Sequence, residues 1–166
     1  MRKFLPIALL LALPGLAAAQ GVATSREFYD NMKSMLTRSA QLMPEADFAF
    51  KPVATVRSFG QILGHLANEN FDFCAAANGE KNPNSTDFEK AASKAESVAG
   101  LTAAFAYCDG AYTQSDAQAA QETELFGTKR SRLSVLVFNA IHDAEHYGNI
   151  VTYLRIKGLV PPSSVR

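Results

Sequence analysis

Apolar residues recur every three or four positions along four segments of the chain, which is the spacing of a helix with one buried face. The segments span about residues 25–42, 59–77, 94–113 and 131–157, and no stretch shows the two-residue alternation of a strand. Residues 114–128 are polar and contain a glycine, so we expect a connection with at most a short helical turn. The pattern predicts an all-α fold, a four-helix bundle.

The ends of these helices carry residues that commonly begin or stop a helix. Thr24 or Ser25 is the expected N-cap of the first helix. Ser58 and Gln61 match the S-x-x-Q capping box, in which two side chains satisfy free backbone N–H groups at the start of a helix. Gly158, followed by two prolines, marks the end of the last helix.

Placing residues at 100° intervals predicts the buried face of each helix. For the first helix this face contains Phe28, Met32, Met35, Leu36, Leu42 and Met43. For the last helix it contains Val135, Phe138, His142, His146, Asn149, Ile150, Tyr153 and Ile156. Two histidines therefore fall in the middle of an apolar face. Burying an unpaired imidazole costs on the order of 1–3 kcal/mol, so both need hydrogen-bond partners, an ion or a wet cavity.

The N-terminal residues have the pattern of an export signal. Arg2 and Lys3 precede an apolar run, and Ala17-Ala18-Ala19 forms an A-x-A cleavage pattern before Gln20. The run is broken by prolines and is shorter than the ~20 apolar residues of a spanning helix. We expect a cleavable signal peptide over residues 1–19, no membrane anchor after cleavage, and one mature domain over residues 20–166 in the periplasm or outside the cell.

The charge balance gives no sign of a nucleic-acid partner. The chain has 16 basic and 16 acidic residues, and loss of the signal peptide leaves 14 against 16, a net charge of −2. The short basic group at 129–132 is interpreted as the solvated start of a helix, since nucleic-acid binders cluster Lys and Arg over a whole face. An exposed helix face would also allow a homodimer.

Cys74 and Cys108 are the only two cysteines of the chain. In an oxidising compartment two thiols in one domain can form a bridge, and otherwise they are two small buried residues. Because the sequence does not report the Cα separation of ~4.4–6.8 Å that a disulfide needs, both interpretations stay open.

All three histidines sit where metal ligands would be expected. His142 and His146 are four residues apart and so share one face of a helix, and His65 lies in the middle of another helix. Three neutral imidazoles make an open ligand set, with at least one position left for water or substrate. Nitrogen ligands favour zinc or nickel, whereas manganese or iron would fit if a carboxylate joined them.

Glu69 lies one turn after His65 and is the candidate carboxylate. It is expected as a fourth ligand, as an acceptor for an imidazole N–H or as a general base, and the alternative is a solvated surface residue. Asp143 and Glu145 flank His142 but point off the stripe, so we expect them to be exposed or outside the ligand shell. A further alternative is that the histidines are ordinary core residues bonded to Asn149, Tyr153 or backbone.

Two longer motifs carry a resemblance to a known family. The segments Ser58–Leu66 (SFGQILGHL) and His142–Ile150 (HDAEHYGNI), with the exit loop after Gly158, are similar to the DinB-like family of metal-binding four-helix bundles. The resemblance implies a three-histidine site for zinc or nickel at His65, His142 and His146. Similar members include transferases and isomerases that use low-molecular-weight thiols.

The sequence therefore predicts an exported protein that binds a divalent metal ion through three histidines. One hypothesis is a metal-dependent enzyme, a transferase or hydrolase acting on a small molecule, with Glu69 as its base. The alternative is a protein of the cell envelope that holds a metal or a ligand without chemistry. A third is a structural module in which the histidines are satisfied core groups.

Overall fold

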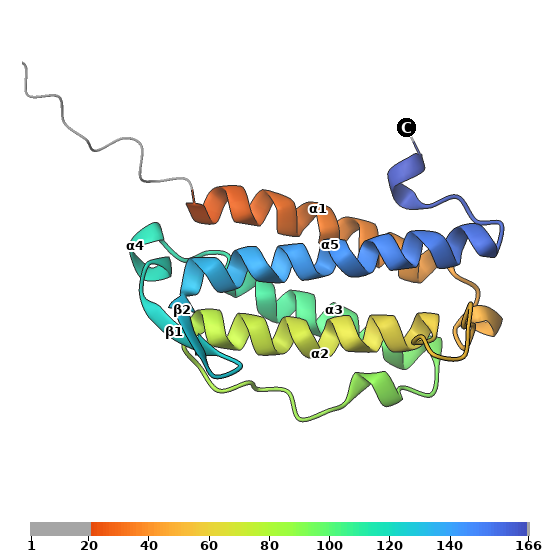
Figure 1. The fold of residues 1–166 in the computed structure, drawn as a ribbon, viewed down its shortest axis with the longest axis horizontal. Helices are drawn as coiled ribbons and strands as arrows, with labels where there is room; N and C mark the ends of the chain where they lie inside the picture. The colour runs from red at the N-terminus through yellow and green to blue at the C-terminus, as the bar shows by residue number, and fades with distance from the viewer. Residues whose placement is uncertain (1–20, 166) are drawn as a thin grey trace, which may run out of the picture.

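Four long helices make up the body of the computed structural model, which describes residues 21–165. They are α1 (Gly21–Leu42), α2 (Phe59–Asn78), α3 (Lys94–Ala111) and α5 (Arg132–Ile156), arranged as a bundle (Figure 1). α2 packs against both α3 and α5, whereas α1 packs mainly against α5 and less extensively against α3. The main body is thus helical, as the apolar periodicity predicts.

Shorter elements fill the connections between these helices. They are the 3₁₀ turns η1 (Glu45–Asp47), η2 (Phe88–Lys90) and η3 (Pro162–Ser164), the short helix α4 (Asp116–Ala119), and the strands β1 (Glu122–Leu125) and β2 (Thr128–Ser131). The element η2 lies against α2 and α3. It brings the long polar connection between those helices back to the bundle surface.

The ends of the helices largely follow their capping residues. The Ser58 hydroxyl accepts from the Gln61 backbone N–H, and the Gln61 side chain accepts from the Ser58 backbone N–H, so the predicted capping box is confirmed. Gly158 has a φ of 74° just beyond α5, as expected for a helix stop. α1 already includes Gly21 instead of starting at Thr24 or Ser25. The backbone N–H of Val22 donates to Asp116, which caps it from α4.

A β-hairpin stands where the sequence predicts only a connection. β1 and β2 pair antiparallel, with Leu125 opposite Thr128, and the tight turn between them consists of Phe126 and Gly127. The prediction that the chain lacks strands is wrong here. These strands are four residues long and mostly exposed, so they carry too little apolar alternation to be recognised.

The buried face of α1 is rotated from the predicted one. Leu36 and Met43 are fully buried as expected, but Phe28 is 61% exposed and Leu42 is 40% exposed. The face is centred instead on Tyr29, whose ring stacks on Tyr112 at 4.1 Å between centroids. Its hydroxyl donates to the Phe105 carbonyl oxygen, which satisfies the polar end of a buried tyrosine.

The buried face of α5 is also rotated, and this changes the setting of the histidines. Phe138, Asn149 and Ile156 are exposed, whereas the centre of the face consists of Asn139, Asp143, Tyr147, Ile150 and Leu154. His142 and His146 are half-buried at its edge, so the prediction that they lie mid-stripe is wrong. The polar residues Asn139 and Asp143 occupy core positions that hydrophobicity alone assigns to the surface.

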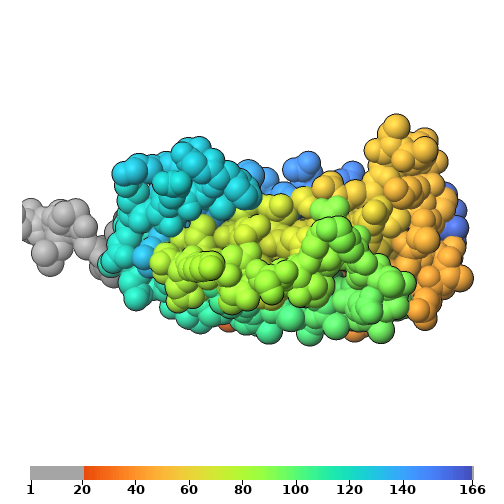
Figure 2. All heavy atoms as spheres, turned by 90° about the horizontal axis from the view of Figure 1, so that it is seen from below, coloured from red at the N-terminus to blue at the C-terminus, as the bar shows by residue number. Residues whose placement is uncertain are grey.

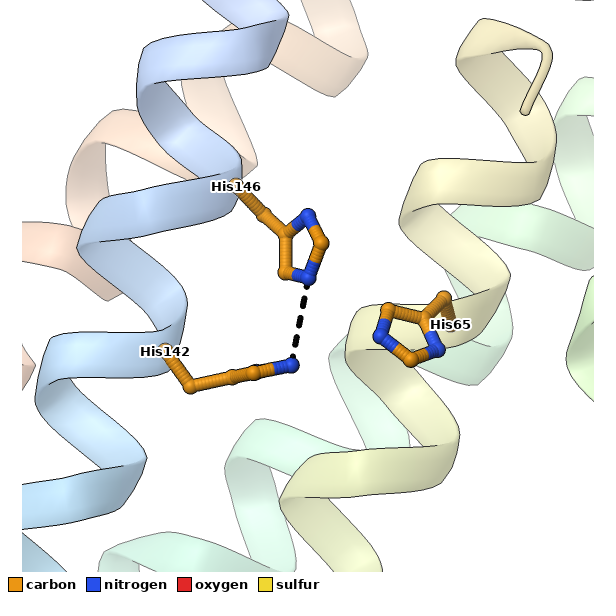
Figure 3. Close-up of side chains that lie close together, drawn as sticks. All are labelled: His65, His142 and His146. Atoms are coloured by element: carbon orange, nitrogen blue, oxygen red, sulfur yellow. Dashed lines mark hydrogen bonds between the residues drawn. The ribbon is translucent and has the colours of Figure 1, made fainter. Parts of the chain in front are cut away.

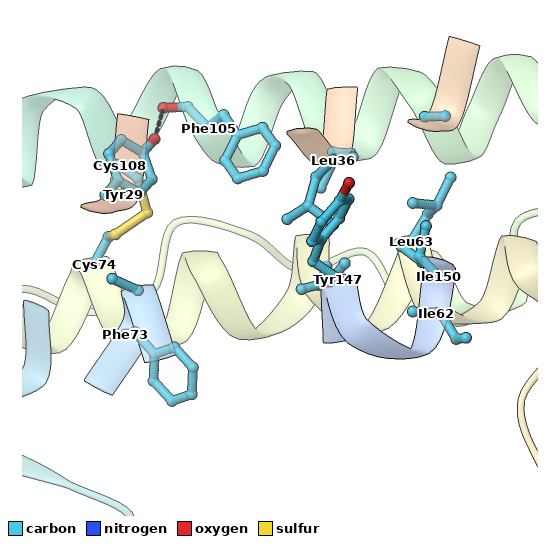
Figure 4. Packing of buried hydrophobic residues seen from close by; sticks show 14 of the residues in the cluster. Tyr29, Leu36, Ile62, Leu63, Phe73, Cys74, Phe105, Cys108, Tyr147 and Ile150 are labelled. Atoms are coloured by element: carbon cyan, nitrogen blue, oxygen red, sulfur yellow. Dashed lines mark hydrogen bonds between the residues drawn. A yellow bond between two sulfur atoms is a disulfide. The ribbon is translucent and has the colours of Figure 1, made fainter. Parts of the chain in front are cut away.

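The two cysteines form a disulfide that joins α2 to α3. Cys74 and Cys108 are fully buried and their Cα atoms lie 5.3 Å apart, within the range that a bridge requires (Figure 4). The open question of the sequence is thus settled in favour of a bridge. It ties the helix that carries His65 to the neighbouring helix of the core.

Between residues 21 and 165, none of the helices is long and apolar enough to cross a membrane. The expected signal peptide and its cleavage after Ala19 lie outside the described residues and stay predictions.

Candidate metal centre

The three histidines converge between α2 and α5. His65 projects from α2 toward His142 and His146, which project from successive turns of α5 (Figure 3). The ring centroid of His65 lies 5.2 Å from that of His142 and 4.8 Å from that of His146. The Nε2 atoms of His142 and His146 are 3.1 Å apart. One nitrogen from each ring lies within 4.8 Å of the other two.

This geometry fits a divalent ion. A tetrahedral zinc site with Zn–N bonds of ~2.0–2.1 Å places its ligand nitrogens roughly 3.3 Å apart. The pair on α5 is already near that spacing, and His65, whose ligand nitrogen lies within 4.8 Å of theirs, needs to approach by up to roughly 1.5 Å. Three imidazoles are the ligand set of open zinc sites and also suit nickel. The residues present could therefore hold such an ion.

The surroundings keep the three imidazoles in the neutral form that binds a metal. Burial, followed by the neighbouring His146 and His65, lowers the pKa of His142 to about 3. Burial and the positive charge of Arg57 lower the pKa of His65, and burial together with His65 lowers that of His146. At neutral pH each ring keeps a lone pair, so a metal does not compete with protons.

A carboxylate orients His65. The His65 Nδ1 atom lies 3.0 Å from Glu89 Oε1, so an Nδ1–H donates to the carboxylate and Nε2 is left free for a metal. Arg57 holds the same carboxylate through Nε and one terminal nitrogen, at 3.0 and 3.3 Å. The series Arg57–Glu89–His65 is the carboxylate–histidine arrangement that fixes the tautomer of metal ligands.

Glu89 is a residue that the sequence reasoning missed, and Gly64 explains its position. A side chain at Gly64 would collide with the Phe88 backbone, so only glycine lets η2 approach α2 this closely. Asn68 accepts from the Phe88 backbone N–H at 3.0 Å and fixes the same segment. A glycine inside a helix destabilises the helix by about 1 kcal/mol relative to alanine. Its place directly before the candidate ligand His65 is the one sequence signal that another segment packs closely there.

Glu69 lies beside the cluster but outside the ligand group. Its Oε1 is 4.0 Å from His65 Nδ1, on the side of the ring that Glu89 already occupies. Burial, with Asp72 and Glu89 nearby, raises its pKa above the usual range of a glutamate. Glu69 therefore lies next to the His65 ring and is not one of the three residues whose ligand atoms converge.

Replacing Glu89 by glutamine is expected to weaken zinc binding by roughly 10–100-fold, the usual effect of removing a carboxylate behind a histidine ligand. The amide keeps the shape but removes the negative charge that makes His65 a stronger donor. Calorimetric titration of chelator-treated protein with zinc measures the loss. Glu145→Gln, on the exposed side of α5, is the control and should bind zinc as the parent does. Equal affinities of Glu89→Gln and the parent would contradict the orienting role.

Asp143 is fully buried, which rules out the exposed one of its two expected positions, while Glu145 is exposed. The Asp143 carboxylate accepts from Asn70 Nδ2 at 2.8 Å, and the same amide donates to the Leu66 carbonyl oxygen at 2.9 Å. This contact links α5 to α2 directly behind the histidines. It fixes the rotation of α5 that turns His142 and His146 toward His65.

Burial raises the pKa of Asp143 from 3.8 to about 7, an effect that the hydrogen bond from Asn70 only partly offsets. The folded protein therefore binds this proton more tightly than the unfolded chain, so the stabilisation is complete below about pH 4 and is lost as the pH rises through about 7. We expect Asp143→Asn to remove this dependence. Urea unfolding of both chelator-treated proteins at about pH 5 and pH 8 measures it. Identical pH dependences would contradict the assignment.

An open cavity borders the histidines at His146. Its volume is about 640 Å³, and its walls include Arg57, Ile62, Asn149 and Tyr153 together with the loop that follows Lys51. Tyr153 fixes that loop because its hydroxyl donates to the Arg57 carbonyl oxygen at 2.6 Å. The volume is that of a site for a small molecule.

Comparisons with known proteins agree with this architecture. A model of the DinB superfamily matches residues 29–150, a range that includes all three histidines. No curated protein sequence matches the chain.

Solved structures with the same fold include two DinB-like proteins from bacilli. One, from Bacillus cereus ATCC 10987, is 11% identical with a TM-score of 0.75, over 89% of this chain and 98% of that one. The other, YjoA from Bacillus subtilis, is 18% identical with a TM-score of 0.62, over 81% and 92% of the two chains. At such identities the likeness concerns the fold alone.

Proposed function

The chain belongs to the DinB superfamily, and from this premise we propose that His65, His142 and His146 hold one divalent metal ion at which a small molecule is chemically transformed. The observation that carries the proposal is the convergence of three neutral imidazoles beside an open cavity. Three protein ligands leave at least one position of the ion for a substrate, as in catalytic zinc sites. Zinc or nickel suits the site better than manganese or iron because, among residues 21–165, the ligand group consists of three histidines without a carboxylate.

The residues around such a site have different proposed roles. When bound, the ion supplies Lewis acidity toward a substrate group in the cavity. Glu89 holds His65 in the tautomer that leaves Nε2 free, and Arg57 holds that carboxylate in place through two hydrogen bonds. Glu69 is the proposed general base, since its raised pKa brings it closer to neutral pH, where proton transfer is most effective.

The catalytic proposal is tested by turnover. The zinc- or nickel-loaded protein is assayed on a panel of esters, amides, epoxides and thiol adducts, beside His146→Ala and Glu69→Gln. We expect hydrolysis or group transfer with at least one class, loss of activity in His146→Ala, and a drop of about 10²–10⁴-fold in Glu69→Gln at unchanged metal content. A loaded protein that turns over no member of the panel, with a full shell of protein ligands, would contradict the proposal.

The second candidate function is a protein that binds a metal or metal-bearing ligand without chemistry. One observation favours it: within residues 21–165 both cysteines are joined in the disulfide, and neither supplies a thiol nucleophile beside the histidines. X-ray absorption at the zinc edge separates the two. If added imidazole replaces a solvent oxygen bound to the zinc ion, the site is open and catalysis is favoured. If protein ligands fill every position of the ion, binding without chemistry is favoured.

We also propose that the protein acts outside the cytoplasm. The disulfide supports this, because such bridges persist mainly in oxidising compartments. N-terminal sequencing of the mature protein tests the proposal: Gln20 as the first residue is expected, and a retained Met1 would contradict it.

A further inference from the structure

Phe126 at the tip of the β-hairpin stands in an unfavourable backbone conformation. Its φ is 51°, a left-handed region that bulky side chains avoid, and asparagine or glycine is the usual choice in such a turn. Its side chain is nevertheless 67% exposed, so burial in the core does not compensate for the strain. A strained, exposed aromatic residue beside a candidate site is a reason to look for a function.

The Phe126 ring is connected to the histidine cluster through other aromatic rings. It packs edge-on against Phe73 of α2, at 5.8 Å between centroids, and Phe138 of α5 packs against the same ring at 5.3 Å. Phe73 in turn packs edge-on against His142 at 5.2 Å. We call Phe73, Phe126 and Phe138 the aromatic ledge. It begins at a proposed metal ligand and ends at the exposed hairpin tip.

The ledge and the open cavity meet the histidines from different sides. The cavity reaches the cluster at His146, and the ledge reaches it at His142. Figure 2 shows the hairpin, in cyan, and the segment near residues 50–57, in yellow, standing on either side of a hollow over α2. The loop with Arg57 therefore bounds one end of the hollow, and the hairpin with Phe126 bounds the other.

We propose that the aromatic ledge binds the apolar part of the molecule whose head binds at the metal, and that Phe126 sets the preference for it. The inference rests on the proposed function of the three histidines. The substrate class is then a small molecule with an aryl or alkyl group a few bonds from a metal-binding head. Phe126 and Phe138, 67% and 39% exposed, offer the ring faces against which such a group is buried. Continuity with the ligand His142 is the reason to assign the ledge to a substrate.

The test compares two hydroxamates, which chelate metal ions in open sites. Acetohydroxamate has no apolar tail, and 4-phenylbutanohydroxamate carries a phenyl group on a flexible chain. Titration of the zinc-loaded protein is expected to give about tenfold tighter binding of the phenyl compound. Phe126→Asn should abolish this gain and leave acetohydroxamate binding unchanged. The control Phe28→Asn, an exposed phenylalanine on α1, should keep the gain.

Thermal unfolding of Phe126→Asn separates a lost binding contact from a damaged fold. Asparagine tolerates the positive φ that phenylalanine resists, so Phe126→Asn should melt at the same temperature or higher, and weaker binding cannot then be assigned to a damaged fold. Equal binding of the two hydroxamates by the parent would overturn the role of the ledge and leave the metal site intact. A gain that survives in Phe126→Asn, or is lost equally in Phe28→Asn, would also overturn it. If neither hydroxamate binds, the open metal site itself fails, and the inference fails with it.

Discussion

Replacing His142 by alanine is expected to lower the affinity for zinc by roughly a hundredfold or more. A structural zinc site yields about 10–16 kcal/mol over four ligands, so one ligand contributes about 3 kcal/mol, or a factor of about 100. His146→Ala should have the same effect, because its Nε2 lies 3.1 Å from that of His142 and both face the same point. Calorimetric titration with zinc measures the affinities of the parent, His142→Ala and His146→Ala.

A control and a second readout separate loss of a ligand from damage to the fold. Ile141→Ala changes a residue beside His142 that is 57% exposed, and it should bind zinc like the parent. Added zinc should raise the melting temperature of the parent and of Ile141→Ala, because it binds only the folded state, and should raise that of His142→Ala by clearly less at the same zinc concentration. Full affinity in His142→Ala would remove this histidine from the site.

Loss of the Cys74–Cys108 bridge is expected to lower the free energy of unfolding by about 4 kcal/mol, which is a large part of the stability of a domain of this size. The bridge joins two residues with a sequence separation of 34. An intact bridge therefore lowers the conformational entropy of the unfolded chain, which stabilises the folded state. Urea unfolding of Cys74→Ala/Cys108→Ala beside the parent measures the difference. A change below about 1 kcal/mol would show that the bridge adds little beyond the packing of α2 on α3.

The disulfide also lies close to the candidate metal site, because Phe73 precedes Cys74 in the sequence. Cys74 follows Phe73, whose ring contacts His142, and both lie on the helix that carries His65. While the double variant remains folded, we expect its affinity for zinc to fall by less than about tenfold, since the histidines and Glu89 keep their contacts. A complete loss of zinc binding in the folded variant would mean that the bridge sets the site geometry directly.

The sequence predicts the helices and the candidate ligands on α5 for the same reason: both depend on local spacing. Apolar periodicity and capping residues such as Ser58 act within one turn, and the interval between His142 and His146 places both on one face whatever the tertiary structure. The convergence of His65 with them needed the bundle, yet the resemblance to DinB-like proteins already implied it. The structure brings the three side chains together, in agreement with that expectation, while their binding of a metal stays a prediction.

The sequence fails where a residue is placed by a distant part of the chain. Glu89 reaches His65 because Gly64 admits η2, a contact between segments more than twenty residues apart. Asp143 is buried although hydrophobicity places an aspartate outside, and Asn70 on another helix donates to its Oδ1, while its buried Oδ2 has no partner among the described residues. In both cases the polar partner comes from a distant part of the chain.

The hairpin illustrates a different limit. Its strands are short, polar and exposed, so their pairing depends on the tight turn and on contacts with α2 and α5 more than on an apolar face. The turn residues Phe126 and Gly127 do not match the Asn-Gly or Asp-Gly signal that usually reveals such hairpins. Phe126 departs from that signal, and its ring packs on Phe73, the residue that contacts His142.

The most direct test of the central claim is a crystal structure of the zinc-loaded protein with diffraction data collected above and below the zinc absorption edge. The three-histidine account predicts one anomalous peak between α2 and α5, with a nitrogen of His65, His142 and His146 each about 2.0–2.1 Å away and one further position taken by solvent. A peak elsewhere, or one that lacks any of the three imidazoles, would contradict it.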